Sequence, residues 1–167
     1  EVWGDALREI KLRKEQVRNC LILGLGGGSA AMKVKDFWPE AEITGVDVDP
    51  VMVDLGKKYL GLNGVNSVIE NAWDFVIKAR RASLKYNLIL IDTYLGSRYP
   101  KELERDDFLL RIRGLLSEGG LAVFNRLYYG EKRREAVKFG GKLDMIFTKV
   151  ERFYPQANLM LIASGTI

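Results

Sequence analysis

One short segment constrains the fold of this 167-residue chain more than any other. An apolar run over Asn19–Leu23 leads directly into the glycine cluster Gly24–Gly28, and a helical pattern begins at Ser29. Glycine adopts left-handed backbone conformations at no steric cost and lets a ligand approach the main chain closely. The N–H groups at the start of the following helix carry a partial positive charge. This order of strand, glycine loop and helix predicts an α/β domain that binds a nucleotide-like cofactor.

The rest of the chain repeats the alternation of strand and helix. Predicted helices cover Val2–Gln16, Ser29–Phe37, Pro50–Leu60, Trp73–Ser83, Phe108–Leu116 and Glu131–Phe139. Predicted strands cover Asn19–Leu23, Glu42–Val48, Val65–Ile69, Tyr86–Ile91, Leu121–Asn125, Thr148–Tyr154 and Leu159–Ala163, with a long loop over Thr93–Leu103. Five strand–helix alternations and a closing strand pair predict a Rossmann-like, doubly wound, mostly parallel seven-stranded sheet with an antiparallel edge, in three α/β/α layers. We expect one domain over residues 1–167, led by a helix at 1–17.

Composition excludes several kinds of chemistry. The chain has no histidine, which removes Ser-His-Asp and Cys-His mechanisms and the commonest metal ligand, and we predict no metal site. Its single cysteine, Cys20, lies in the first predicted strand, where a small buried hydrophobe is the expected role. One cysteine cannot form an internal disulfide, which fits the reducing cytoplasm. No apolar run reaches the ~18 residues that a membrane span requires. We therefore expect a cytoplasmic protein without membrane contact.

The formal net charge of +4 is modest. Basic residues gather in Lys78–Arg81 and Lys132–Arg134, both inside helical patterns. The simplest interpretation is that these clusters form solvated helix faces. Binding of RNA or another polyanion is the alternative that such clusters leave open.

Polar residues follow the second, third and fourth predicted strands. Asp47 comes about 20 residues after the glycine loop, where a carboxylate can accept hydrogen bonds from ribose hydroxyls. A surface or helix-capping acid is the alternative for this residue. Asn71 follows the third strand, and Asp92 ends the fourth. A dinucleotide fingerprint would place its third glycine at position 29, where the chain has Ser29, so a nicotinamide dehydrogenase is disfavoured.

Four segments carry a resemblance that extends from Trp3 to Ala163. They are Leu-Ile-Leu-Gly-Leu-Gly-Gly-Gly-Ser, Gly-Val-Asp-Val-Asp-Pro, Tyr-Asn-Leu-Ile-Leu-Ile-Asp-Thr and Leu-Leu-Ser-Glu-Gly-Gly-Leu. In this order and spacing they resemble the class I S-adenosylmethionine-dependent methyltransferases, and more narrowly the spermidine synthase-like branch. The resemblance implies S-adenosylmethionine, or its decarboxylated form, as the cofactor.

The resemblance also implies a role for each matching cofactor residue. The methionine part and the ribose would lie against three loop glycines, Gly24, Gly26 and Gly28. Asp47 would accept both ribose hydroxyls, and Val48 and Ala72 would flank the adenine. Asn71 stands where the family usually has an aspartate that accepts from the adenine amino group. Its amide oxygen can accept the same hydrogen bond without charge assistance.

The fourth strand end is the predicted catalytic position. Asp92, which would also contact the cofactor, can act as a general base, and Tyr94 can help to orient an acceptor. Helix capping is the alternative for Asp92, and loop packing is the alternative for Tyr94 and Tyr99. The family's second active-site aspartate is replaced by Leu95, which can neither hold an ammonium group nor take a proton. This replacement argues against polyamine synthesis.

The predicted function is methyl transfer from S-adenosylmethionine to an unidentified acceptor, most simply a small molecule. Methyl transfer requires mainly the alignment of an acceptor atom with the methyl carbon. The alternatives are an aminopropyltransferase that uses decarboxylated S-adenosylmethionine and a cofactor-binding homologue without catalytic activity. The Tyr128-Tyr129 pair either lines the acceptor pocket or lies exposed in a loop. A homodimer is also compatible with the predicted function.

Overall fold

The structure is a computed structural model that describes residues 2–165. Within this range seven strands form one sheet in the order β3-β2-β1-β4-β5-β7-β6. The strands are β1 (Asn19–Leu23), β2 (Glu42–Asp47), β3 (Asn66–Ile69), β4 (Tyr86–Ile91), β5 (Leu116–Leu127), β6 (Lys149–Phe153) and β7 (Asn158–Ser164). β1 to β5 pair in parallel, and β7 is antiparallel to both of its neighbours. The predicted sheet with an antiparallel edge is confirmed.

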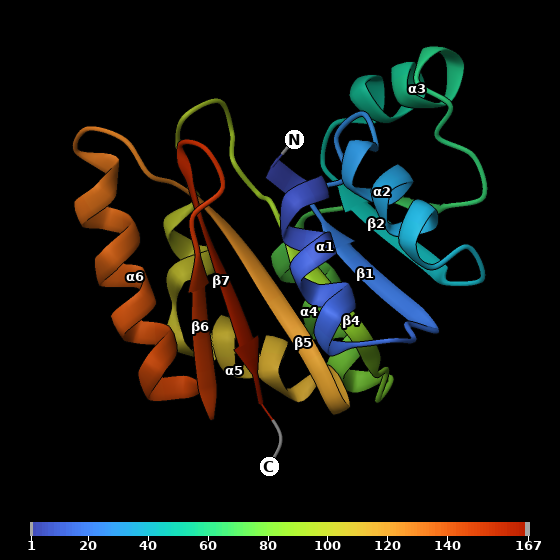
Figure 1. The fold of residues 1–167 in the computed structure, drawn as a ribbon. Coiled ribbons are helices and arrows are strands. Elements are labelled where there is room, and N and C mark those ends of the chain that lie inside the picture. Colours follow the sequence, from blue (N-terminus) through green and yellow to red (C-terminus); the bar gives the residue numbers. More distant parts are fainter. Residues whose placement is uncertain (1, 166–167) are drawn as a thin grey trace.

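Helices cover both faces of this sheet (Figure 1). They are α1 (Val2–Arg13), α2 (Ser29–Phe37), α3 (Pro50–Tyr59), α4 (Ala72–Arg81), α5 (Asp106–Gly114) and α6 (Lys132–Ile146), with a short 3₁₀ helix η1 (Lys101–Glu104). α1 and α2 share a core with Cys20 and Ile22, whereas α4, α5 and α6 pack with Leu21 and Leu23. Adjacent residues of β1 thus pack into the hydrophobic cores on opposite faces of the sheet, because strand side chains alternate between faces. The result is the predicted three-layer arrangement.

Some element boundaries differ from those predicted. β5 starts at Leu116, before the expected Gly119-Gly120 turn, because Leu116 pairs with Tyr86 ahead of a shift in register. Gly119, at φ +69°, lies inside this irregular section of the strand. The loop over Thr93–Leu103 contains most of η1. α6 continues seven residues beyond Phe139, because a buried stripe that includes Leu143 outweighs the low helix propensity of two glycines.

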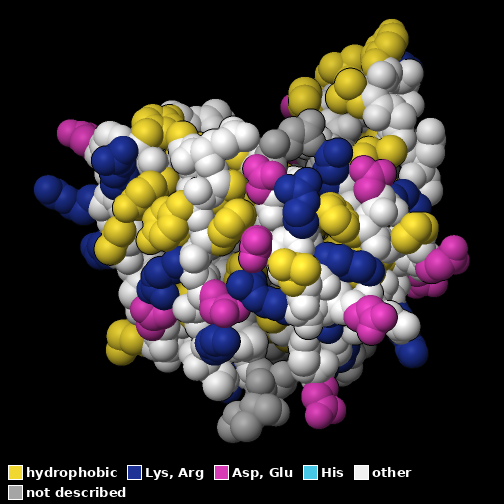
Figure 2. Space-filling view, viewed as in Figure 1, with side chains coloured by type: hydrophobic (Ala, Val, Ile, Leu, Met, Phe, Trp, Pro, Cys, Tyr) yellow, Lys and Arg dark blue, Asp and Glu magenta, His cyan; other side chains and the backbone are white. Residues whose placement is uncertain are grey.

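Helix α3 projects from one end of the sheet and exposes an apolar face (Figures 1 and 2). The exposed apolar residues of this helix and its C-cap are Val51, Met52, Leu55, Tyr59 and Leu60. The helix is held on its other side by Val53 and Gly56, which are buried. A Cβ on Gly56 would lie 2.6 Å from the carbonyl oxygen of Gly27. α3 therefore packs closely against the glycine loop.

No helix within residues 2–165 combines the length and the apolarity that crossing a lipid bilayer requires.

The burial of Cys20 gives a direct test of this packing. Its side chain has no exposed surface, and burial raises the pKa of its thiol. Since the thiolate is the reactive form, alkylation at pH 8 should require opening of the core. We expect labelling at least ~1,000-fold slower than in guanidinium, because such opening costs several kcal/mol. The measurement is mass-resolved iodoacetamide labelling, with the denatured protein as the control. Rapid labelling of the native protein would contradict the structure.

Candidate active site

A cleft opens at the carboxyl ends of the first four strands. Its lining residues are Gly24, Val46, Asp47, Val48, Glu70, Asn71, Ala72, Asp92, Thr93, Tyr94, Leu95, Pro100, Glu102 and Leu103. Parallel pairing gathers these residues, because it places the carboxyl ends of β1 to β4 at one edge. All the predicted site residues are in this set except Gly26 and Gly28.

The three glycines of the loop have different surroundings. Gly24 has φ +91°, and a Cβ there would lie 1.9 Å from the carbonyl oxygen of Asp92. Gly28 has φ +92°, and its Cβ would lie 2.5 Å from the side chain of Leu62. Gly26 has φ +53° with open space around it. A main-chain carbonyl thus excludes a side chain at position 24. At position 28 the positive φ disfavours other residues and the Leu62 side chain would have to move, whereas a Cβ on Gly26 would meet open space.

Asp47 organises the glycine loop from the end of β2. Its Oδ2 accepts from the Gly26 N–H at 2.6 Å, and its Oδ1 accepts from the Asp49 N–H at 2.9 Å. A carboxylate offers about four acceptor sites, so further hydrogen bonds to hydroxyl groups remain available. The helix-capping role belongs to Asp49, whose side chain accepts from two N–H groups at the start of α3.

Asn71 caps helix α4. Its Oδ1 accepts from the Trp73 N–H at 2.8 Å, as expected of an asparagine at an N-cap. Asparagine is favoured at helix starts, so this capping role could have been predicted from the sequence, although it was not. The second lone pair on Oδ1 and the amide N–H groups can still serve a ligand, so the predicted adenine contact stays a prediction.

Asp92 is held by residues from distant parts of the chain. Its Oδ2 accepts from Trp3 Nε1–H on α1 at 2.9 Å. Its Oδ1 accepts from Asn125 Nδ2–H on β5 at 3.1 Å, and Asn125 Oδ1 accepts from Asn158 at 2.8 Å. Both oxygens of Asp92 thus accept from side chains, and neither contact is to a helix terminus. Sequence reasoning missed Trp3 and Asn125, although an asparagine closing an apolar strand was a usable signal.

Two tyrosines pack the loop that follows Asp92. The Tyr94 hydroxyl accepts from the Leu127 N–H at 2.8 Å, and its ring meets that of Tyr99 edge to face at 5.3 Å. Tyr99 is buried, and this burial raises its pKa to about 12 against the opposing effects of Arg126 and Thr93. The loop-packing alternative therefore describes both rings. Tyr94 also lines the cleft, so its catalytic role stays a prediction.

The Tyr128-Tyr129 pair does not line the cleft. The Tyr128 ring packs at 5.1 Å against that of Tyr154, on the turn between β6 and β7, and Tyr129 is 46% exposed. The exposed-loop alternative therefore describes Tyr129, while Tyr128 belongs to an aromatic contact.

The cleft is acidic although the chain is basic overall. Its charged lining residues are the carboxylates Asp47, Glu70, Asp92 and Glu102, and no lysine or arginine joins them. Glu70 forms an ion pair with the exposed Lys78, and this hydrogen bond raises the pKa of the lysine. Among residues 2–165 no three acids or cysteines converge as a metal site would require. Such a cleft favours a cationic organic ligand.

Comparisons with known proteins find two groups of sequence relatives. No family model matches the chain. It is 32% identical over 108 residues to a polyamine aminopropyltransferase of Vibrio vulnificus, a match that covers 63% of this chain and 36% of the relative. It is 26% identical over 165 residues to the eEF1A lysine and N-terminal methyltransferase of Mus musculus, covering 93% of this chain and 24% of the relative. The chain thus spans about a quarter to a third of these relatives.

Solved structures extend the likeness over the whole fold. Human methyltransferase-like protein 13 in complex with SAH superposes with a TM-score of 0.79 at 22% identity, covering 98% of this chain and 79% of that one. Spermidine synthase from Thermotoga maritima superposes with a TM-score of 0.73 at 19% identity, covering 90% and 55%. These likenesses and the strand order define a Rossmann-like methyltransferase fold. By its sequence and structure neighbours, the chain resembles the S-adenosylmethionine-dependent methyltransferase superfamily and, within it, the spermidine synthase-like branch.

Proposed function

We propose that this chain binds S-adenosylmethionine in the cleft and transfers its methyl group to an amine nitrogen. The observation that carries this proposal is the Asp92 carboxylate, which Trp3 and Asn125 hold beside the glycine loop. Two neutral donors orient the carboxylate without neutralising its charge. A carboxylate in this position can bind an ammonium group and accept its proton.

The cofactor would lie along the edge formed by the first four strands. Val48 and Ala72 offer apolar contacts for the adenine, and Asn71 offers an amide. Asp47 retains acceptor capacity for the ribose hydroxyls. The methionine part would run past the open main chain at Gly26 toward Asp92.

The proposed reaction needs only Asp92 as the proton acceptor. The protonated amine gives a proton to Asp92 and becomes nucleophilic. Its lone pair then forms the new N–C bond while the S–C bond breaks, and the sulfur keeps the bonding electrons. The products are the methylated ammonium and S-adenosylhomocysteine. The protein contributes mainly alignment of the nitrogen with the methyl carbon, because the sulfonium supplies its own leaving group.

An amine acceptor is supported by the four carboxylates that line the cleft. The names of the two groups of relatives point the same way, since one names polyamines and the other names lysine and the N-terminus. These relatives differ in the group that they transfer, but an amine is common to both.

Aminopropyl transfer is the second candidate. It is favoured by the absence of lysine or arginine among the cleft residues, since decarboxylated S-adenosylmethionine has no carboxylate to pair. Leu95 weighs against it. This residue is 53% exposed at the tight turn that it forms with Arg98, and it offers no charge to the second ammonium of a diamine.

Calorimetric titration with S-adenosylmethionine, S-adenosylhomocysteine and decarboxylated S-adenosylmethionine tests both candidates. We expect binding of the first two ligands, with weaker binding of the third. Transfer of a labelled methyl group to a panel of amines, including lysine peptides and diamines, then identifies the acceptor. Preference for the decarboxylated form together with turnover of diamines would establish the second candidate. If none of the three ligands binds at millimolar concentration, both candidates fail.

A further inference from the structure

Arg126 is a buried charge in the middle of an apolar environment. Its side chain on β5 is 2% exposed, and Nη1 lies 2.8 Å from a carboxylate oxygen of Glu104. Its guanidinium carbon lies 4.0 Å from the ring centroid of Tyr99 and 4.4 Å from that of Phe139. Burying the charge of Arg126 is costly, and an apolar side chain of similar size at this position would often be at least as stable. The presence of arginine here therefore suggests a role beyond stability.

The partners of Arg126 lie on the segment that closes one side of the cleft. We call residues Thr93–Glu104 the outer wall, because six of them line the cleft: Thr93, Tyr94, Leu95, Pro100, Glu102 and Leu103. Residues 93–104, all of which the structure describes, contain no strand of the sheet. Their single β-bridge joins Leu95 to Arg98 within the segment itself. Its position therefore depends on side-chain contacts, of which Arg126 supplies two, to Tyr99 and Glu104.

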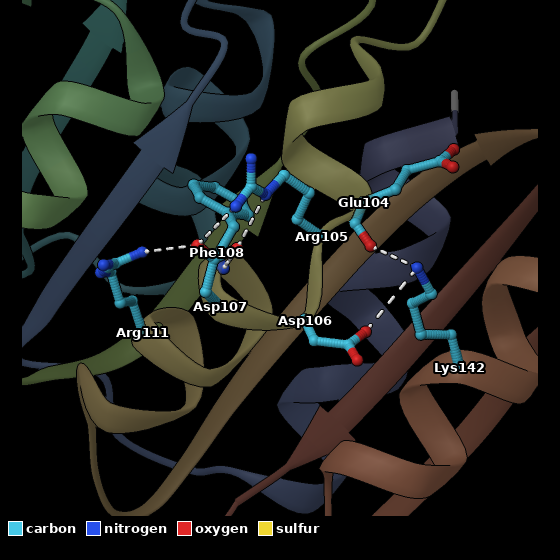
Figure 3. A network of polar contacts seen from close by, with 7 residues as sticks. All are labelled: Glu104, Arg105, Asp106, Asp107, Phe108, Arg111 and Lys142. Atoms are coloured by element: carbon cyan, nitrogen blue, oxygen red, sulfur yellow. Dashed lines mark hydrogen bonds and ion pairs between the residues drawn. The ribbon is translucent and has the colours of Figure 1, made fainter.

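Further contacts from β5 and α6 secure the same segment. The Leu127 N–H, next to Arg126, donates to the Tyr94 hydroxyl at 2.8 Å. Lys142 of α6 donates to the Glu104 carbonyl oxygen at 2.8 Å and lies 3.7 Å from the Asp106 carboxylate, as Figure 3 shows. The outer wall is therefore fastened to β5 and α6, which lie outside the cleft.

We propose that Arg126 is a positioning residue that holds the outer wall over the cleft, so that ligand affinity depends on its ion pair with Glu104. A guanidinium is planar, permanently charged and able to stack on a ring while it pairs with a carboxylate, so it fixes ring and carboxylate in one geometry. A wall that is already ordered spares the ligand the entropy of ordering it. The inference rests on the proposed function only in its choice of S-adenosylhomocysteine as the probe.

The test compares Arg126→Met, Glu104→Gln and the double variant with the wild type. Glu104→Gln leaves the buried Arg126 without its counter-charge and should lower the melting temperature. Arg126→Met should lower it less, because the Glu104 side chain is 33% exposed and can be solvated. The double variant removes both charges and should recover much of that loss. We nevertheless expect all three to bind S-adenosylhomocysteine at least tenfold more weakly. They should also exchange amide hydrogens faster in residues 93–104, with β1 and β4 unchanged.

The matched control is Arg152→Met, which removes an exposed arginine paired with Asp144 at 2.6 Å, away from the outer wall. It should leave both affinity and exchange unchanged. A double variant that regains stability and binds S-adenosylhomocysteine as tightly as the wild type would overturn the inference, because Arg126 would then serve stability alone. If the wild type itself does not bind S-adenosylhomocysteine, the proposed function fails, and the exchange of residues 93–104 still decides the role of Arg126.

Discussion

Asp92→Asn should lower the rate of methyl transfer by about 10²- to 10⁴-fold, the usual contribution of a general base. The carboxylate accepts from Trp3 on one oxygen and from Asn125 on the other. An asparagine side chain has one oxygen and one NH₂ group, so one of these donors would face another donor. The substitution thus removes the charge that attracts the amine and the acceptor for its proton, while the β4 strand stays intact.

The measurement is transfer of a labelled methyl group to the amine identified in the panel, alongside the dissociation constant of S-adenosylhomocysteine. We expect the rate to fall far more than the affinity does. Asp74→Asn is the matched control, since Asp74 is an exposed carboxylate on α4 that does not line the cleft. Unchanged turnover in the Asp92 variant would exclude the general-base role.

Trp3→Phe isolates the contribution of the indole N–H. It keeps an aromatic ring in the core and removes the donor to Asp92, so we expect a smaller loss of turnover than in Asp92→Asn. The chain has three tryptophans, and the indole signal lost from the nitrogen-15 spectrum of this variant identifies Trp3. That signal should shift in Asp92→Asn. If it does not move, the hydrogen bond between the two residues is absent in solution.

A second large effect is expected from alanine substitutions in the glycine loop. Gly24→Ala should destabilise the protein by about 2–5 kcal/mol, from a left-handed backbone and from overpacking. Its Cβ would lie 1.9 Å from the Asp92 carbonyl oxygen, so β1 and the segment after β4 must separate. Gly26→Ala meets no neighbouring atom and should cost only the ~1–2 kcal/mol of the backbone conformation.

Gly24→Ala should have the larger effect on stability, and Gly26→Ala should have the larger effect on ligand binding by the folded protein. Gly26→Ala should remain folded at 25 °C yet bind S-adenosylhomocysteine at least tenfold more weakly, because its methyl group enters space that the ligand is proposed to use. Urea unfolding and calorimetry give the two quantities. Gly141→Ala in α6 is the control, since its Cβ also meets open space and alanine favours helix. Normal binding by Gly26→Ala would contradict the proposed path of the cofactor.

Much of the fold could be predicted because its signals are local. The apolar run at Asn19–Leu23, the glycines after it and the similar run at Tyr86–Ile91 identify parallel strands buried on both faces. Parallel topology then brings the strand ends together, so Asp47 and Asp92 were expected on one edge. Boundaries were less predictable: α6 continues through Gly140-Gly141 because its buried stripe lies against the sheet, which no local pattern shows.

The sequence by itself determined the order of strands and helices, the glycine loop and the set of polar residues at the carboxyl edge of the sheet. These follow from hydrophobic periodicity and backbone sterics, which act over a few residues. Only the tertiary structure decided that Trp3 donates to Asp92, 89 residues away, and that Arg126 is buried against Glu104. Such contacts depend on how α1 and the outer wall dock on the sheet. That docking is the sum of many weak side-chain contacts between distant segments, and it leaves no mark in the local pattern.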